Sequence, residues 1–347
     1  MEAVRPPIKK INPTARTSVR LEKPQQVRMG PLLSETTLPL LIQATAGTDA
    51  VLWATEERST IEQSLLQHGG ILLRGFKVES LADFQRFIEA ASGDLLKYTY
   101  RSTPRTEVTH NIYTSTEYPA NQEIPLHNEN SYSRHWPLKV FFFCEKNAEE
   151  GGRTPIADSY QVFERIPAAV RDRFIDKKVM YVRNYGGGAD LPWQEVFQTQ
   201  DQGEVERFCR GAGIDYEWRD NGRLRTRQVC QAVARHPKTG RMVWFNQAHL
   251  FHVSSLEPEL RDAMLEVFAE EDLPRHALYG DGTPIETSAL DEIRQVYRQT
   301  QVSFPWQEGD ILMLDNMAVA HGRTPYRGER KIRVGMTEQI DGDQIEA

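Results

Sequence analysis

The sequence predicts a mainly β protein with surrounding helices, in which a double-stranded β-helix (jelly-roll) core carries a large mixed insertion. Short apolar runs typical of buried strands occur at residues 71–76, 139–144 and 311–314. These runs lie near both ends of the chain, and antiparallel pairing over such separations suits a double-sheet jelly roll with helices packed outside. Residues 186–300 mix helical and strand patterns, so we expect them to form the insertion, between the strands that carry the candidate metal ligands.

The N-terminal 35 residues are rich in Pro, Lys, Arg and Thr and lack apolar periodicity, which predicts an extended or disordered arm. Residues 36–347 are expected to form a single domain. An amphipathic pattern predicts a helix from Thr48 to Leu66, with Thr48 or Asp49 as N-cap, and Ser80 is expected to cap a second helix. Further elements are expected as helices at 161–175, 204–212, 258–269 and 290–300, a hairpin turn at 237–240, and a closing strand at 331–336.

Composition narrows the class of protein. Hydrophobic residues make up 39% and charged residues 26%, which is typical of a soluble globular protein. The net charge of −7 argues against a nucleic-acid surface. The three cysteines lack CxxC spacing, and neither a signal peptide nor a membrane-spanning apolar run is evident. We therefore expect a cytoplasmic protein that binds neither nucleic acid nor membrane, and the oligomeric state stays open.

A pair of candidate metal ligands organises the chain. His127 and Glu129 are separated by one residue, so on an extended strand their side chains share a face while Asn128 points the other way. Imidazole and carboxylate both bind divalent transition metals, and His321 is the best third donor. Two His and one carboxylate form the facial triad of non-haem Fe(II) oxygenases. A His-x-Glu pair alone is weak evidence for a metal site, and the alternative interpretation is a polar pair at the end of a strand.

The order His127-x-Glu129, His321 and then Arg330, nine residues later, resembles the TauD/TfdA family of Fe(II)/2-oxoglutarate-dependent dioxygenases. The carboxylate residue is Glu129 and not the commoner Asp, and in this respect the sequence resembles the clavaminate-synthase-like branch of the family. The segments 125–132, 151–158 and 315–326 resemble the syringomycin-type aspartate β-hydroxylases of that family, and the likeness covers about residues 65–337.

The resemblance implies the roles of five residues. His127, Glu129 and His321 would be the catalytic Fe(II) ligands, leaving open positions for 2-oxoglutarate and O2 as cosubstrates. Arg330 would bind the far carboxylate of 2-oxoglutarate through its planar fork, and Thr154 would hydrogen-bond the same carboxylate. For Arg323, Arg327 and Arg333 a structural or surface role is at least as good an interpretation.

Substrate contacts are less sharply indicated. Basic side chains that could meet a substrate carboxylate include Arg101 and Arg105. The remaining candidate substrate-binding residues are Tyr113, Thr114, Ser115, Asn246 and Arg333. Asn246 belongs to an aromatic cluster that either lines the site or is a core strand. For His249 and His252, three residues apart, we favour structural or pocket-lining roles over a second metal.

The resemblance implies an oxygenase of secondary metabolism, including antibiotic biosynthesis, that hydroxylates an unactivated C–H bond and releases succinate and CO2. The implied substrate is an amino acid or its derivative, free or tethered to a peptidyl carrier protein. Halogenation is rejected because Glu129 is present. Alternatives are desaturation or cyclisation, another small acid such as a sulfonate, a non-enzymatic jelly-roll binding protein, and a zinc hydrolase, which would leave Arg330 and Thr154 idle.

Overall fold

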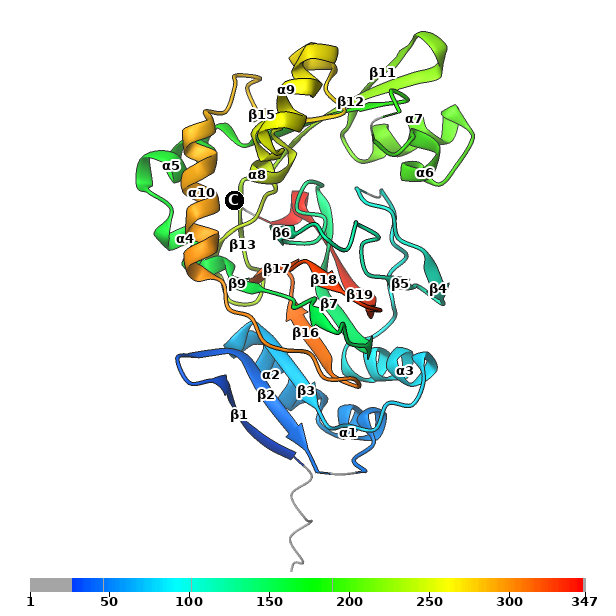
Figure 1. Cartoon of the computed structure of the whole chain (residues 1–347), viewed down its shortest axis with the longest axis vertical. Coiled ribbons are helices and arrows are strands. Elements are labelled where there is room, and N and C mark those ends of the chain that lie inside the picture. Colours follow the sequence, from blue (N-terminus) through cyan, green and yellow to red (C-terminus); the bar gives the residue numbers. More distant parts are fainter. Residues whose placement is uncertain (1–26, 46, 101, 189, 346–347) are drawn as a thin grey trace, which may run out of the picture.

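A computed structural model describes residues 27–345, apart from residues 46, 101 and 189. Its largest sheet has eight strands and occupies the lower half of the view in Figure 1, from β1 at the lower left to β4 at the right. All its strand pairs are antiparallel except β2 with β3. In spatial order the strands are β1 (Val27–Leu33), β2 (Thr36–Ala44), β3 (Gly70–Arg74), β16 (Ile311–Asp315), β7 (His135–Lys146), β19 (Lys331–Asp341), β5 (Ile112–Thr114) and β4 (Glu107–Thr109).

A smaller set of strands packs against this sheet and completes the double-stranded β-helix that the sequence predicts. Its strands are β6 (Ile124–His127), β17 (Val319–Arg323) and β9 (Ile156–Asp158), with the pair β8 (Glu150–Gly151) and β18 (Tyr326–Arg327) beside them. One apolar core joins the two layers, with Phe142 and Val334 from the large sheet and Ile156 and Val319 from the small one.

Helices cover the other face of the large sheet. They are α1 (Ala50–Glu56), α2 (Arg58–His68) and α3 (Leu81–Ala91). Phe141 and Phe143 of β7 face these helices, whereas Phe142 faces the interior. Burial on both faces explains the continuous apolar run in β7. The N-caps Asp49 and Ser80 are confirmed, since each side chain accepts a backbone N–H of its helix; the helix expected at 48–66 is divided at Glu57.

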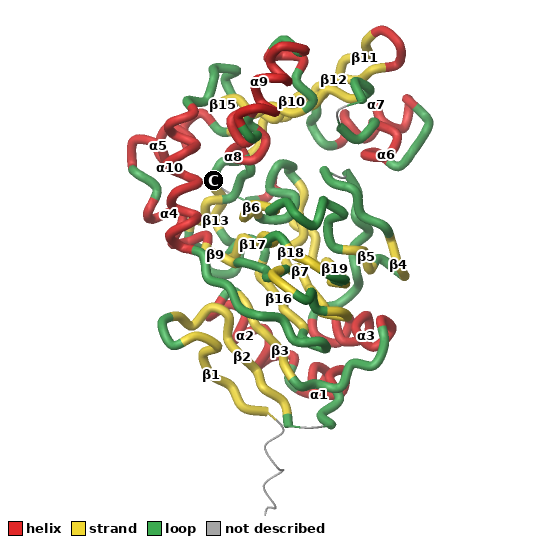
Figure 2. Tube along the Cα trace, in the orientation of Figure 1, coloured by secondary structure: helices red, strands yellow, loops and turns green. Residues whose placement is uncertain are grey.

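Between β9 and β16 the chain forms a second lobe, at the top of Figure 1. Its four-stranded sheet has the order β11-β12-β10-β15. Figure 2 shows helices around this sheet and strands at the centre of the molecule. The lobe comprises α4 (Ser159–Arg165), α5 (Ala168–Lys177), β10 (Val179–Tyr185), α6 (Trp193–Phe197), α7 (Gln202–Gly211), β11 (Asp215–Arg219), β12 (Arg223–Cys230), β13 (Val233–Arg235), β14 (Met242–Trp244), α8 (Ala248–Phe251), α9 (Pro258–Val267), β15 (Arg275–Tyr279) and α10 (Thr287–Thr300).

Two predicted boundaries differ from the structure. The predicted arm, residues 1–35, includes the strand β1, which pairs with β2; residues 1–26 lie outside the described residues. As an edge strand with a partly exposed face, β1 lacks the apolar periodicity that would reveal it. The insertion begins before residue 186, because β10 is an inner strand of its sheet. No described helix is both long and apolar enough to cross a membrane.

Candidate metal and 2-oxoglutarate site

Two histidines face each other across the antiparallel strands β6 and β17. His127 and His321 are direct partners in the strand register, and their ring centroids lie 4.6 Å apart. The His127 Nδ1 donates to the Pro125 carbonyl at 2.8 Å, so its Nε2 is the nitrogen left for a metal. Strand pairing therefore brings together two imidazoles from residues 194 positions apart in the sequence (321 − 127).

Glu129 lies beyond the end of β6, in a turn in which Asn130 has a positive φ of 56°. The expectation of an extended strand through 127–129 is therefore wrong, although Glu129 does join the histidines. The buried Asn316 fixes its backbone: the Glu129 N–H donates to Asn316 Oδ1 at 2.7 Å, and Asn316 Nδ2 donates to the Glu129 carbonyl at 2.9 Å. The Asn128 side chain, expected to point away from the two donors, is fully buried and donates to the Asn316 carbonyl.

The donor atoms of His127, Glu129 and His321 all lie within 4.8 Å of one another. Burial lowers the pKa of both His127 and His321. Burial alone would raise the pKa of Glu129, but Arg105 and His127 hold it below its usual value. Neutral imidazoles and an ionised carboxylate are the protonation states that bind a metal, so this donor set fits Fe(II).

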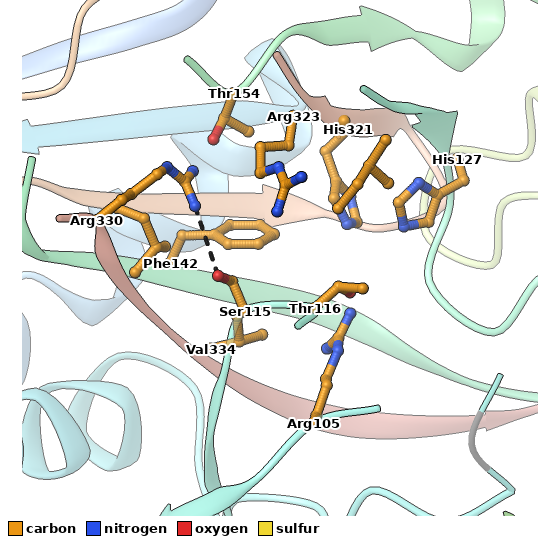
Figure 3. A pocket seen from close by; sticks show the side chains of 13 residues that line it. Arg105, Ser115, Thr116, His127, Phe142, Thr154, His321, Arg323, Arg330 and Val334 are labelled. Carbon is orange, nitrogen blue, oxygen red and sulfur yellow. Dashed lines mark hydrogen bonds between the residues drawn. The ribbon is translucent and has the colours of Figure 1, made fainter. Parts of the chain in front are cut away.

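A cavity with an empty volume of about 370 Å³ is lined by two of the three donors, His127 and His321. Figure 3 shows the two imidazoles at one end of it, Arg330 at the other end, and Phe142 between them. The Phe142 ring lies 4.9 Å from the His321 ring. The cavity is lined by Arg105, Ser115, Thr116, Ile124, His127, Phe142, Thr154, His321, Gly322, Arg323, Arg330, Ile332 and Val334.

Arg330 and Thr154 both reach this cavity. The Arg330 Nε donates to the Gly152 carbonyl at 3.0 Å, and burial together with the neighbouring Arg323 lowers the pKa of Arg330 to about 10. Within the described part of the chain no carboxylate pairs with Arg330. The Thr154 hydroxyl accepts from Trp306 Nε1 at 3.1 Å, so its own proton is available to another acceptor. A guanidinium and a hydroxyl donor without an internal anion fit the far carboxylate of 2-oxoglutarate.

The candidate substrate residues separate into two groups. Arg105 and Ser115 line the cavity. Tyr113, Thr114, Asn246 and Arg333 do not line it, and the reasons are local. Tyr113 packs in the core, and Thr114 bonds to Glu117. Asn246 bonds the backbone of Ala232 and Ala248, and Arg333 pairs with Glu145 at 2.5 Å. Arg101 lies outside the described residues.

Other expected structural roles agree with the geometry. Arg323 donates to three backbone carbonyls between residues 118 and 122 and so fixes that loop. His249 donates to the Leu126 carbonyl, and its ring lies tilted against the Tyr297 ring, 4.8 Å between centroids. The His252 ring instead lies against the His276 ring, 4.8 Å between centroids. His249 and His252 therefore do not share a site.

Sequence reasoning missed two residues of the site, Asn316 and Trp306. Asn316 stands in the segment 315–326 that carries the family resemblance, and that position was the available signal. Trp306 occurs in a loop without a motif, 152 residues from Thr154, and nothing in the local sequence predicts the contact.

Comparison with known proteins agrees with this geometry. The family model "Taurine catabolism dioxygenase TauD, TfdA family" matches residues 36–336. Dapdiamide synthesis protein DdaC of Enterobacter agglomerans is 41% identical over 280 residues, covering 81% of this chain and 85% of DdaC. A clavaminate synthase-like protein of Arabidopsis thaliana is 32% identical over 288 residues, covering 80% and 83% of the two chains.

The fold is also that of a solved structure. The crystal structure of PvcB from Pseudomonas aeruginosa superposes with a TM-score of 0.57 at 15% identity, over 94% of this chain and 98% of PvcB. The extent of the family match, together with the donor set at the cavity, identifies the protein: the chain belongs to the TauD/TfdA family and is a dioxygenase that uses Fe(II) and 2-oxoglutarate.

Proposed function

We propose that the enzyme hydroxylates an unactivated C–H bond of an amino acid or amino-acid derivative, with release of succinate and CO2, in secondary metabolism. The observation that carries this proposal is the arrangement of the cavity. His127 and His321, which Glu129 joins to form a complete donor set, line one end, and Arg330, which pairs with no carboxylate of the described residues, lines the other. A similar protein, DdaC, is named for dapdiamide synthesis, which favours a biosynthetic substrate.

Each side of the cavity has a distinct task in this proposal. When bound, Fe(II) with 2-oxoglutarate and O2 supplies the oxidising power that breaks the C–H bond. His127, Glu129 and His321 would hold the metal, while Arg330 and Thr154 would hold the far carboxylate of 2-oxoglutarate. The apolar side chains of Phe142, Ile332 and Val334 would exclude water between these two ends.

The test is an assay of succinate formation and O2 uptake with a panel of amino acids, both free and tethered to a peptidyl carrier protein. A product heavier by one oxygen atom supports hydroxylation, and a product lighter by two hydrogens indicates desaturation or cyclisation. The variant Glu129→Ala is the matched control, because it removes one donor and keeps both imidazoles. Amino acids that leave succinate formation at the level of this control would contradict the proposed substrate class, and sulfonates would be tested next.

A further inference from the structure

A buried ion pair joins Arg105 to the metal-site carboxylate Glu129. The Arg105 Nη2 lies 2.7 Å from Glu129 Oε2, and each side chain is only 4% exposed. The Arg105 guanidinium also lies 4.9 Å from the centre of the Tyr98 ring, in a cation–π arrangement. The same Glu129 oxygen is 3.8 Å from His321 Nε2, so Arg105 contacts the carboxylate on the atom that faces the metal site.

The segment that carries Arg105 is held by the insertion. Gln198, from the insertion, donates through Nε2 to the Tyr98 carbonyl at 2.8 Å. Arg275, also from the insertion, donates to the Ser102 carbonyl and pairs with Asp190. Two backbone carbonyls upstream of Arg105 are thereby fixed by residues that are remote from it in sequence.

We propose that Arg105 is a positioning residue for the iron ligand Glu129, and that the insertion determines where Arg105 lies. A buried carboxylate has several rotamers and is costly to leave unpaired. A guanidinium held in a fixed place, 2.7 Å from one carboxylate oxygen, selects one rotamer of Glu129 before metal binds. Partners of this kind, behind the metal ligands, commonly set metal affinity by orienting the ligand. The proposal concerns metal binding and rests on the iron site, not on the identity of the substrate.

The charge of Arg105 and its orienting role predict opposite effects on metal affinity when Arg105 is removed. As a cation, Arg105 repels a divalent metal, so its removal would tighten binding if only charge mattered. As an orienting group it favours binding, so its removal would weaken it. Arg105→Lys keeps the positive charge and loses the planar fork, whereas Arg105→Met loses both.

The experiment is a titration of the apoprotein with Co(II) alone, without 2-oxoglutarate or substrate, followed by visible absorption. We expect Arg105→Met and Arg105→Lys each to weaken Co(II) binding by about 10-fold or more, and the matched control Arg333→Met to change it by less than about twofold. Arg333 also pairs with a glutamate, Glu145, but lies outside the cavity lining. Thermal unfolding of each variant shows whether the fold is kept.

Unchanged or tighter Co(II) binding in a folded Arg105→Met protein would overturn the proposal and assign Arg105 to charge balance or to substrate. If Arg105→Met does not fold, Arg105→Lys decides the same question. Arg275→Met tests the role of the insertion separately. Weaker Co(II) binding in this variant would support the claim that the insertion positions Arg105, and wild-type binding would contradict that claim. Because the titration contains no amino acid, a wrong substrate class would leave these results unaffected.

Discussion

At the scale of single residues, Arg330 gives the most direct test of the cosubstrate site. Arg330→Met removes a guanidinium that faces the cavity and pairs with no carboxylate among the described residues. Charge-assisted hydrogen bonds contribute about 1.5–3 kcal/mol, so the 2-oxoglutarate concentration for half-maximal succinate formation should rise by about 10- to 100-fold. Arg333→Met is the control and should change this concentration little. A larger effect from Arg333 than from Arg330 would show that the assignment of the arginines is wrong.

The grouping of His127, Glu129 and His321 was predictable, because each residue type can bind a metal and the spacing resembles that of the family. Geometry was less predictable. Glu129 reaches the site from a turn instead of a strand, and its placement depends on Asn316, 187 positions away. Arg105 was expected at a substrate carboxylate, and it pairs with a carboxylate of the protein itself. Such pairings depend on the three-dimensional fold, which local sequence does not contain.

At the scale of elements, the close approach of β6 and β17 depends on Gly322. A Cβ at this position would lie 2.6 Å from the Ile124 carbonyl oxygen, so Gly322→Ala must push β17 away from β6. We expect a destabilisation of about 1–3 kcal/mol and weaker metal binding, since His321 is the neighbouring residue and pairs with His127 across these strands. Urea unfolding and Co(II) titration measure the two effects.

Gly211→Ala is the matched control for this substitution. Gly211 is the last residue of α7, and a Cβ added at this position would meet no heavy atom within 4 Å. It should leave metal binding unchanged and keep or slightly raise stability, because alanine favours helix over glycine. Equal metal affinity in Gly322→Ala and Gly211→Ala would show that the strand contact does not align the histidines.

The loop between β16 and β17 is the second element that shapes the site. Asn316→Ala removes hydrogen bonds to the Glu129 N–H, to the Glu129 carbonyl and to the Pro137 carbonyl. Because these groups are buried, we expect roughly 2–4 kcal/mol of destabilisation and reduced Co(II) affinity. Asn128→Ala should also destabilise the protein, since its side chain bonds Ser159 and the Asn316 carbonyl. Wild-type unfolding midpoints in both variants would contradict this account.

Short apolar runs revealed the central strands β3, β7 and β16, and an alternating apolar pattern revealed the start of β19. Strands β17 and β9 show no such run, because β17 contains the polar His321 and Arg323 and β9 has only three residues. Their pairing is set by the tertiary fold. The helix expected at 161–175 is two helices, α4 and α5, separated at Pro167, because proline cannot supply the N–H that a continuous helix requires.

At the scale of the whole molecule, the core and the insertion meet beside the metal site. His249 of α8 is 3% exposed and donates through Nε2 to the Leu126 carbonyl of β6 at 3.0 Å. Its Nδ1 has no hydrogen-bond partner in the described part of the chain. The sequence predicted an insertion and a structural role for His249. The contact between the two lobes through His249 and Leu126, here called the joint, became visible only in the fold.

This joint makes stability depend on pH. Burial lowers the pKa of His249 to about 3, from an ordinary value of 6.5. Between these values the unfolded chain binds a proton that the folded chain excludes, so the free energy of unfolding falls as the pH is lowered from 6.5 towards 3. The contribution of one such group reaches about 1.4 kcal/mol per pH unit. His252, whose pKa is lowered to about 4 by burial and by His276, adds a second contribution of the same sign.

His249→Gln keeps an amide donor for the Leu126 carbonyl and cannot be protonated. Urea unfolding of this variant and of the wild type, at several pH values between 6.5 and 4.5, should therefore give a shallower loss of stability in the variant, by up to about 1.4 kcal/mol per pH unit. Carboxylates titrate in both proteins, so their contributions largely cancel in the comparison. His249→Gln with His252→Gln should flatten the profile further. Parallel profiles in the wild type and His249→Gln would mean that His249 is protonated in the folded protein, and that the joint opens without unfolding.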